Sequence, residues 1–61
     1  MKSKYIVRFE WAGSHMWMED TFTNDGKGFD EIDATYIAGE LSARPNIRRV
    51  RIEEFKEEGE Q

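Results

Sequence analysis

The sequence predicts an α+β fold: a three-stranded antiparallel sheet with strand order 2-1-3 and one helix packed on one face, in the chain order ββαβ. Two N-terminal segments alternate between apolar and polar residues, and a third such segment follows Pro45. Between them lies a segment with acidic residues at its start and apolar residues at helical spacing. A right-handed crossover from the second strand would bring the third strand beside the first, so the most apolar strand lies in the centre.

Length and composition confine the chain to one small domain. Only 38% of its 61 residues are hydrophobic, which places the core near the lower limit for independent folding, with a stability of about a few kcal/mol. We expect residues 1–55 to form the domain and residues 56–61 to be an acidic, disordered tail. The chain has no Cys, and its longest apolar run is too short to span a bilayer. We therefore expect a cytoplasmic protein with no membrane contact.

The first two strands, 4–11 and 16–23, should form a hairpin closed by a two-residue turn that begins at Gly13. In that turn the glycine supplies a positive φ. The register that follows places Phe9 opposite Met18. The face that the helix should cover then collects Tyr5, Val7, Phe9, Trp11, Met16, Met18 and Phe22.

The helical segment should begin after Asp30 as N-cap and continue to about Ala43, where Pro45 prevents its continuation. Its apolar residues form two stripes, and only one of them is needed to cover the sheet. The other stripe must curl over the sheet edge, meet a partner or meet a second copy of the chain. The two stripes are Ala34, Ile37, Ala38 and Leu41, and Ile32, Tyr36, Gly39 and Ala43.

The opposite face of the sheet should carry ion pairs and one exposed aromatic residue. The same register places Arg8 opposite Glu19 and Glu10 opposite Trp17. A local basic cluster surrounds the last strand, 47–55. Its arginines could contact phosphates, or could protect the edge of the sheet from unwanted pairing. These arginines are Arg44, Arg48, Arg49 and Arg51.

Nothing in the sequence assembles a catalytic, metal or cofactor site. His15 is the one histidine, and it falls at a turn. Asp20 lies on the apolar face and would be a candidate acid if buried, but an edge strand should let it reach solvent. The glycines of the loop 24–28 lack the spacing of a phosphate-binding loop. We therefore expect neither an enzyme nor a bound cofactor or metal.

These observations favour a small protein-binding module that modulates or inhibits a larger partner protein. The expected contact residues are Trp17, Ile32, Tyr36, Arg49 and Arg51. In size and character the chain resembles small accessory proteins of phages and mobile elements, which implies an inhibitor of a host protein but assigns no residue. One alternative is a nucleic-acid-binding module that uses the cluster Arg44, Arg48, Arg49 and Arg51. Another is a structural homodimer through Ile32, Tyr36, Gly39 and Ala43.

Overall fold

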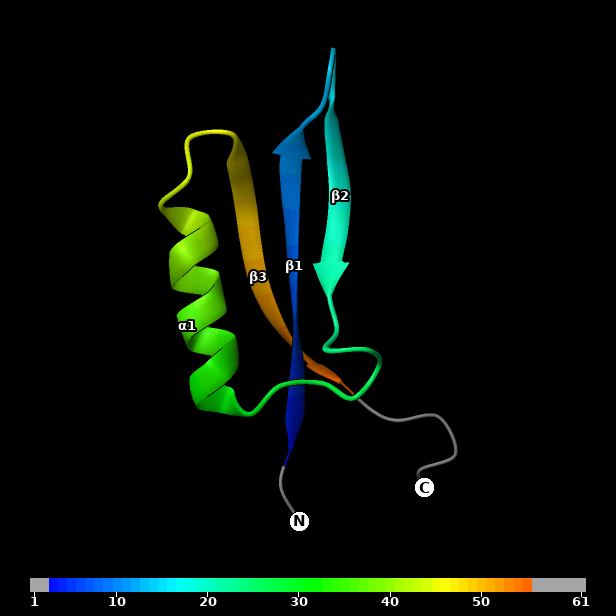
Figure 1. The fold of residues 1–61 in the computed structure, drawn as a ribbon, viewed down its shortest axis with the longest axis vertical. Coiled ribbons are helices and arrows are strands. Elements are labelled where there is room, and N and C mark those ends of the chain that lie inside the picture. Colours follow the sequence, from blue (N-terminus) through cyan, green and yellow to red (C-terminus); the bar gives the residue numbers. More distant parts are fainter. Residues whose placement is uncertain (1–2, 56–61) are drawn as a thin grey trace.

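The computed structural model describes residues 3–55 and contains three strands and one helix in the order ββαβ. The strands β1 (Lys4–Ala12), β2 (Trp17–Phe22) and β3 (Ile47–Phe55) form one antiparallel sheet in the order β2-β1-β3. The helix α1 (Glu31–Ser42) lies on one face of this sheet (Figure 1). The predicted fold class and strand order are therefore confirmed. The predicted tail, residues 56–61, lies outside the described residues.

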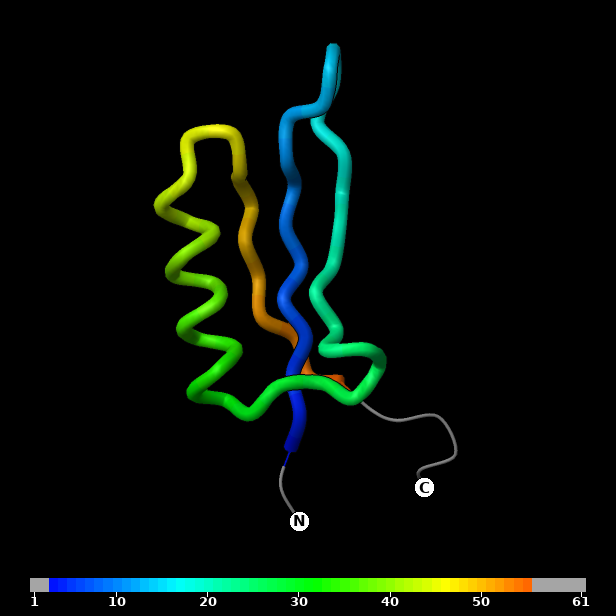
Figure 2. Tube along the Cα trace, in the orientation of Figure 1, coloured from blue at the N-terminus to red at the C-terminus, as the bar shows by residue number. Residues whose placement is uncertain are grey.

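The chain between β2 and α1 crosses over the start of β1 before it enters the helix (Figure 2). Phe29 pairs there with Tyr5 through two backbone hydrogen bonds: the Tyr5 N–H donates to the Phe29 oxygen over 2.8 Å, and the Phe29 N–H donates to the Tyr5 oxygen over 2.7 Å. Phe29 thus continues the β2 side of the sheet beyond the end of that strand.

The core lies between the centre of β1 and one stripe of the helix. Val7 and Phe9 of β1 pack with Ala34 and Leu41 of α1, and all four are buried. Complete burial of a Val, Leu or Phe side chain contributes about 1.5–3 kcal/mol each, so this cluster is the main source of stability. Partly buried apolar residues complete the core: Tyr5, Trp11, Phe29, Ile37, Ala38, Ile47 and Val50. The stripe that contains Ala34 and Leu41 is therefore the one that faces the sheet.

The helix covers only two of the three strands. It packs on β1 and β3, whereas no Cα atom of α1 lies within 8 Å of one in β2, both elements being fully described. On β2, Met18 and Phe22 are consequently 42% and 44% exposed. Met16, before β2, is 66% exposed. The prediction that the helix would cover these three residues is wrong.

The hairpin register differs from the predicted one by two residues. Phe9 lies opposite Asp20, not Met18, and Glu10 lies opposite Glu19, not Trp17. The Gly13 N–H donates to the Met16 oxygen over 2.7 Å, so these two residues pair and leave Ser14 and His15 at the tip.

Two predicted details of the hairpin are wrong for this reason. Arg8 lies opposite Thr21, and Gly13 is not among the residues with positive φ. A shift of two residues keeps every side chain on its predicted face, because side chains alternate with a period of two. The assignment of faces therefore stands although the pairing does not.

An irregularity in the pairing of β1 with β3 adds one residue to β3. Arg8 lies opposite Arg51, but Glu10 lies opposite Arg48, so the register shifts between them. Arg49 lies within this bulge and has a φ of 56°. The bulge lets Arg48 and Arg51 share the face that points away from the helix.

The two ends of the helix agree with the predicted boundaries. Asp30 is the N-cap residue, but its side chain makes no capping hydrogen bond. Its Oδ1 instead accepts a hydrogen bond from Lys4 Nζ over 2.9 Å, which ties the start of α1 to the start of β1. The helix ends at Ser42, with Ala43 as C-cap.

The loop before the helix is held in shape by its own hydrogen bonds. Asn24, Asp25, Gly26 and Gly28 all have positive φ. The Gly28 N–H donates to the Thr23 oxygen over 2.8 Å, and Asn24 Nδ2 donates to the Gly28 oxygen over 3.0 Å. A Cβ at Gly28 would lie 2.7 Å from Lys4 Cβ and 3.0 Å from a ring carbon of Phe55. The loop therefore packs tightly on the sheet at Gly28.

We predict that Gly28→Ala destabilises the protein more than Gly26→Ala. Both glycines have positive φ, at 79° and 83°, so each alanine carries a strain of about 1–2 kcal/mol. Only the alanine at position 28 also collides with its neighbours, which adds about 1–3 kcal/mol. Urea denaturation of both variants measures the difference. Equal losses would show that Gly28 is not packed as described.

Candidate functional site

One part of the helix-side surface is left without a covering element, and we call it the open face. It combines the helix side of β2, Phe29, which continues the sheet beyond β2, and the helix residues nearest to them. Its residues are Met18, Asp20, Phe22, Asn24, Phe29, Asp33, Tyr36 and Ile37. The ring centroid of Phe22 lies 5.2 Å from that of the buried Phe9, which fixes Phe22 beside the core although it is exposed. The open face is thus a lateral extension of the core to the surface.

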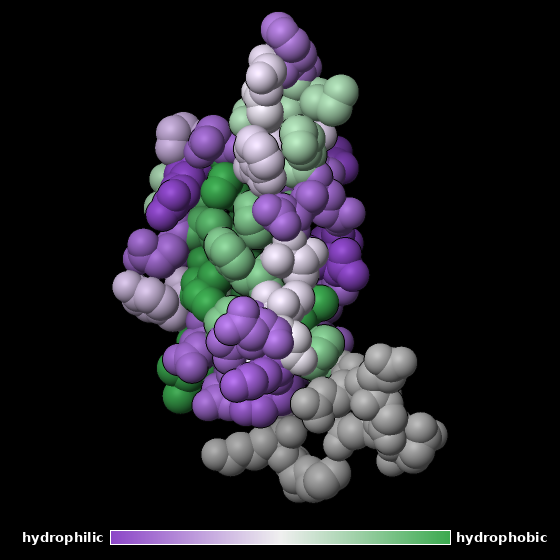
Figure 3. Space-filling view, turned by 45° about the vertical axis from the view of Figure 1, so that its right-hand side comes forward, coloured by the Kyte–Doolittle hydropathy of each residue, from purple (hydrophilic) through white to green (hydrophobic). Residues whose placement is uncertain are grey.

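The open face is hollowed at one end. A cavity of about 270 Å³ lies between the helix and the segment that follows β2, lined by Asn24, Phe29, Asp33, Tyr36 and Ile37. In space-filling view, a band of hydrophobic side chains runs down the molecule between hydrophilic flanks (Figure 3). The band is apolar, whereas the cavity is lined by both polar and apolar side chains.

The charged groups of the open face are both acids. Asp20 lies between Met18 and Phe22 on the same side of β2, and Asp33 lines the cavity from the helix. Asp20 is exposed, as expected for an edge strand, and its Oδ1 accepts a hydrogen bond from the Thr21 N–H over 2.8 Å. The open face therefore carries one acid among its β2 residues and one acid in the lining of its cavity.

The second helix stripe is exposed and adjoins the open face at Tyr36. Ile32 is 82% exposed and Tyr36 is 68% exposed. A Cβ at Gly39 would meet nothing within 4 Å beyond its chain neighbours and the helix's own backbone, so packing among the described residues does not account for this glycine. Apolar residues in this arrangement on a helix are typical of a contact surface.

The face of the sheet opposite the helix is a network of ion pairs. Glu10 accepts from Arg48 over 3.0 Å and lies 3.6 Å from Arg49, while Arg51 pairs with Glu19 over 3.1 Å. Arg8 pairs with Glu53 over 2.8 Å, and Ile6 is buried beside them. The opposed carboxylates of Glu10 and Glu19 each have an arginine partner, which explains how like charges are tolerated across the hairpin.

Trp17 lies on this network face, where Arg48 stacks on it. The guanidinium carbon is 4.2 Å from the centroid of the indole ring, and Trp17 retains 38% exposure. The expectation that Trp17 is partly exposed is confirmed, but it lies opposite Ala12. Since Arg48, Arg49 and Arg51 each have a glutamate partner, the basic cluster is largely compensated.

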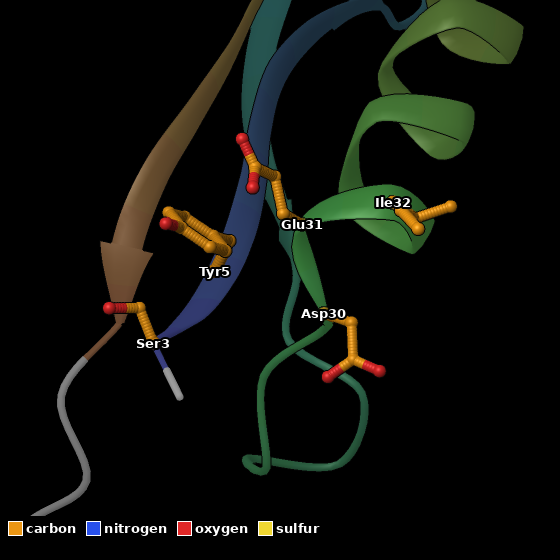
Figure 4. Close-up of a pocket in the computed structure, with 5 residues that line it drawn as sticks. All are labelled: Ser3, Tyr5, Asp30, Glu31 and Ile32. Atoms are coloured by element: carbon orange, nitrogen blue, oxygen red, sulfur yellow. The ribbon is translucent and has the colours of Figure 1, made fainter. Parts of the chain in front are cut away.

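A second cavity, of about 360 Å³, lies between the beginnings of β1 and α1, lined by Ser3, Tyr5, Asp30, Glu31 and Ile32. Its side chains do not converge: Ile32 points away from Tyr5, and the two carboxylates point in different directions (Figure 4). His15 is exposed at the hairpin tip, away from both cavities. Within residues 3–55, no group of three or more His, Cys, Asp or Glu residues could hold a metal ion.

The five predicted contact residues fall on two opposite surfaces. Ile32 and Tyr36 lie together on the helix, whereas Trp17, Arg49 and Arg51 belong to the sheet's other side. The structure does not bring these two groups together.

Sequence reasoning missed Met18 and Phe22 as surface residues. A signal was present: one helix is about 10 Å wide and strands lie about 4.8 Å apart, so it covers about two strands.

No protein-family model, no curated protein and no solved structure matches this chain. In the described part of the chain, no helix is both long enough and apolar enough to cross a membrane.

We predict that Gly39→Ala raises the free energy of unfolding by about 1 kcal/mol, the usual difference between alanine and glycine inside a helix. The added methyl group meets no atom outside the helix's own backbone. Thermal denaturation compares the variant with wild type, and Thr35→Ala, at another exposed helix position, is the matched control. A loss of stability at position 39 would mean that the open space there is occupied.

Proposed function

We propose that the protein is a small binding module that acts by contact with a larger protein and not by catalysis, with the open face as its binding surface. One observation carries the proposal: a helix that covers β1 and β3 leaves β2 with two large apolar residues, Met18 and Phe22, at the surface beside Phe29 and Tyr36. In a soluble domain, a contiguous apolar surface bordered by charges is typical of a protein interface. Such a module would modulate or inhibit its partner, as the small accessory inhibitors do.

The open face has more to gain from a protein contact than the ion-pair network. Burial of its apolar side chains releases water at about 25 cal/mol per Å². Arg49 and Arg51 already have glutamate partners in the free protein. Their burial against a partner would cost the removal of their charges from water. For this reason we place the principal contact at Met18, Phe22 and Tyr36, with Ile32 at its margin.

A second candidate function is a structural homodimer through the exposed helix stripe. The exposure of Ile32 and Tyr36, together with the open space at Gly39, favours it, because glycine lets two helices approach closely. The nucleic-acid alternative has weaker support, since Arg48, Arg49 and Arg51 are paired with glutamates. Phosphates would have to compete with those carboxylates.

We predict that Met18→Ser combined with Tyr36→Ser strongly reduces capture of a partner that wild type captures. Loss of two apolar contacts should weaken binding about tenfold or more. Tagged wild type and variant are incubated with lysate of the source organism, and bound proteins are quantified by mass spectrometry. Circular dichroism verifies that both chains are folded.

The matched control is Arg49→Glu combined with Arg51→Glu, on the network face. A partner lost with the first variant and kept with the control supports the proposal. A partner kept with the first variant and lost with the control would move the binding surface to the network face. A protein captured equally by all three chains is not a specific partner, and if only such proteins are captured the proposal fails.

We predict that purified wild type sediments as a monomer, because α1 and the open face serve a different protein. Analytical ultracentrifugation of wild type and Tyr36→Asp measures this, with Thr35→Asp on the other flank of α1 as control. A wild-type dimer that only Tyr36→Asp dissociates would establish the second candidate instead.

A further inference from the structure

We propose that β2 accepts an extended segment of the partner as a fourth strand, and that this segment carries basic residues between apolar ones. The inference rests on the proposed function and specifies the partner's chemistry. It depends on three features of the structure: the free backbone edge of β2, the apolar side chains of the open face, and the acids that lie among them.

The backbone of β2 presents hydrogen-bonding groups away from the sheet at alternate residues. In an antiparallel pair, alternate residues of a strand bond to the same neighbour. The bond from the Gly13 N–H to Met16, and the two bonds between Tyr5 and Phe29, show that odd-numbered residues of β1 bond toward β2. Their partners in β2 are Met18, Asp20 and Phe22. The backbone N–H and C=O groups of the intervening residues Trp17, Glu19 and Thr21 therefore point away from the sheet at its edge.

The two edges of the sheet are protected differently. On β3, a bulge with a positive φ at Arg49 and a row of arginines oppose the addition of another strand. The edge of β2 has no proline, bulge or lysine in Trp17–Phe22. Among residues 3–55, the Thr21 N–H is the outward group that bonds within the chain: it donates to Asp20 Oδ1. β2 is therefore the edge that is open to another strand.

Charge decides which strand would fit. The middle of β2 carries Glu19 and Asp20, one on each face. If two copies of β2 paired in antiparallel fashion about their centres, the acids of one copy would lie opposite or next to the acids of the other. Like charges across a strand pair are destabilising. Glu19 already pairs with Arg51, so a segment gains chiefly from a lysine or arginine opposite Asp20. Its apolar residues would lie beside Met18 and Phe22.

A designed peptide tests the inference: acetyl-TVKKKVT-amide, in which the helix-side residues are Val, Lys and Val. It reads the same in both directions, so either orientation of the added strand is sampled. Hydrogen exchange by NMR follows the backbone amides of ¹⁵N-labelled protein. We expect the amides of Trp17 and Glu19 to gain protection when the peptide is added, and those of β3 to remain unchanged. Acetyl-TVEEEVT-amide is the matched control and should not bind.

Two pairs of variants separate the backbone from the charges. Glu19→Pro removes an outward N–H and should weaken binding about tenfold relative to Glu19→Gln, which loses the same charge and the same pair with Arg51. Asp20→Asn retains an oxygen for the Thr21 N–H but removes the charge, and should weaken binding about threefold. Thr35→Asn is the corresponding control on the helix.

Three results would overturn the inference: no binding at about 1 mM peptide, equal binding of the two peptides, or protection confined to β3. If the peptide fails while capture of the partner still requires Met18 and Tyr36, strand addition is wrong and the proposed function stands. If neither is observed, both are wrong. Protection of the same amides in the protein alone as its concentration rises would identify a second copy as the occupant.

Discussion

The width of a single helix relative to a three-stranded sheet determines which parts of this molecule are buried. A helix is about 10 Å across and neighbouring strands are about 4.8 Å apart, so one helix covers about two strands. In this chain the helix packs on β1 and β3, although Ile52 of β3 is still 42% exposed. The short connection from Ser42 to Ile47 keeps α1 near the strand that follows it. The longer segment after β2 crosses β1 and leads the chain away from β2 (Figure 2). The apolar side of β2 is thus exposed by topology, and the residues there extend the core without being enclosed by it.

Much of the fold could be predicted from the sequence, because alternation, turn residues and helix boundaries are local signals. The strand order, the helix limits at Asp30 and Ser42, and the face of every strand residue in the hairpin follow from such signals. The register does not. Two loops of two residues are compatible with the same run of polar and small residues: Gly13 with Ser14, or Ser14 with His15. The bond between Gly13 and Met16 selects the second. Had the shift been one residue, Trp17 and Met18 would have exchanged faces.

The candidate site was harder to predict, because it depends on which strand the helix does not contact. The exposure of Tyr36 and Ile32 could be anticipated from the two helix stripes, and that of Trp17 from its place opposite the helix side. The exposure of Met18 and Phe22 depends on the position of α1 across the sheet, which no local pattern encodes. The bulge at Arg49 is likewise a long-range result, since it adjusts β3 to β1. The bulge places Glu10 opposite Arg48, with which it pairs.

The distribution of charge is related to this architecture. On the network face, Arg8, Arg48, Arg49 and Arg51 lie with Glu10, Glu19 and Glu53, so four positive charges meet three negative ones. The chain as a whole carries a formal net charge of −4, and this negative charge must therefore come from outside that network. Asp20 and Asp33 are part of it, and they lie within the surface that the helix leaves uncovered. Acids within an apolar surface favour encounter with basic segments and oppose self-association through the same surface. In the strand addition that we propose, the acids of β2 would favour a basic segment over a second copy of β2, because like charges across a strand pair are destabilising.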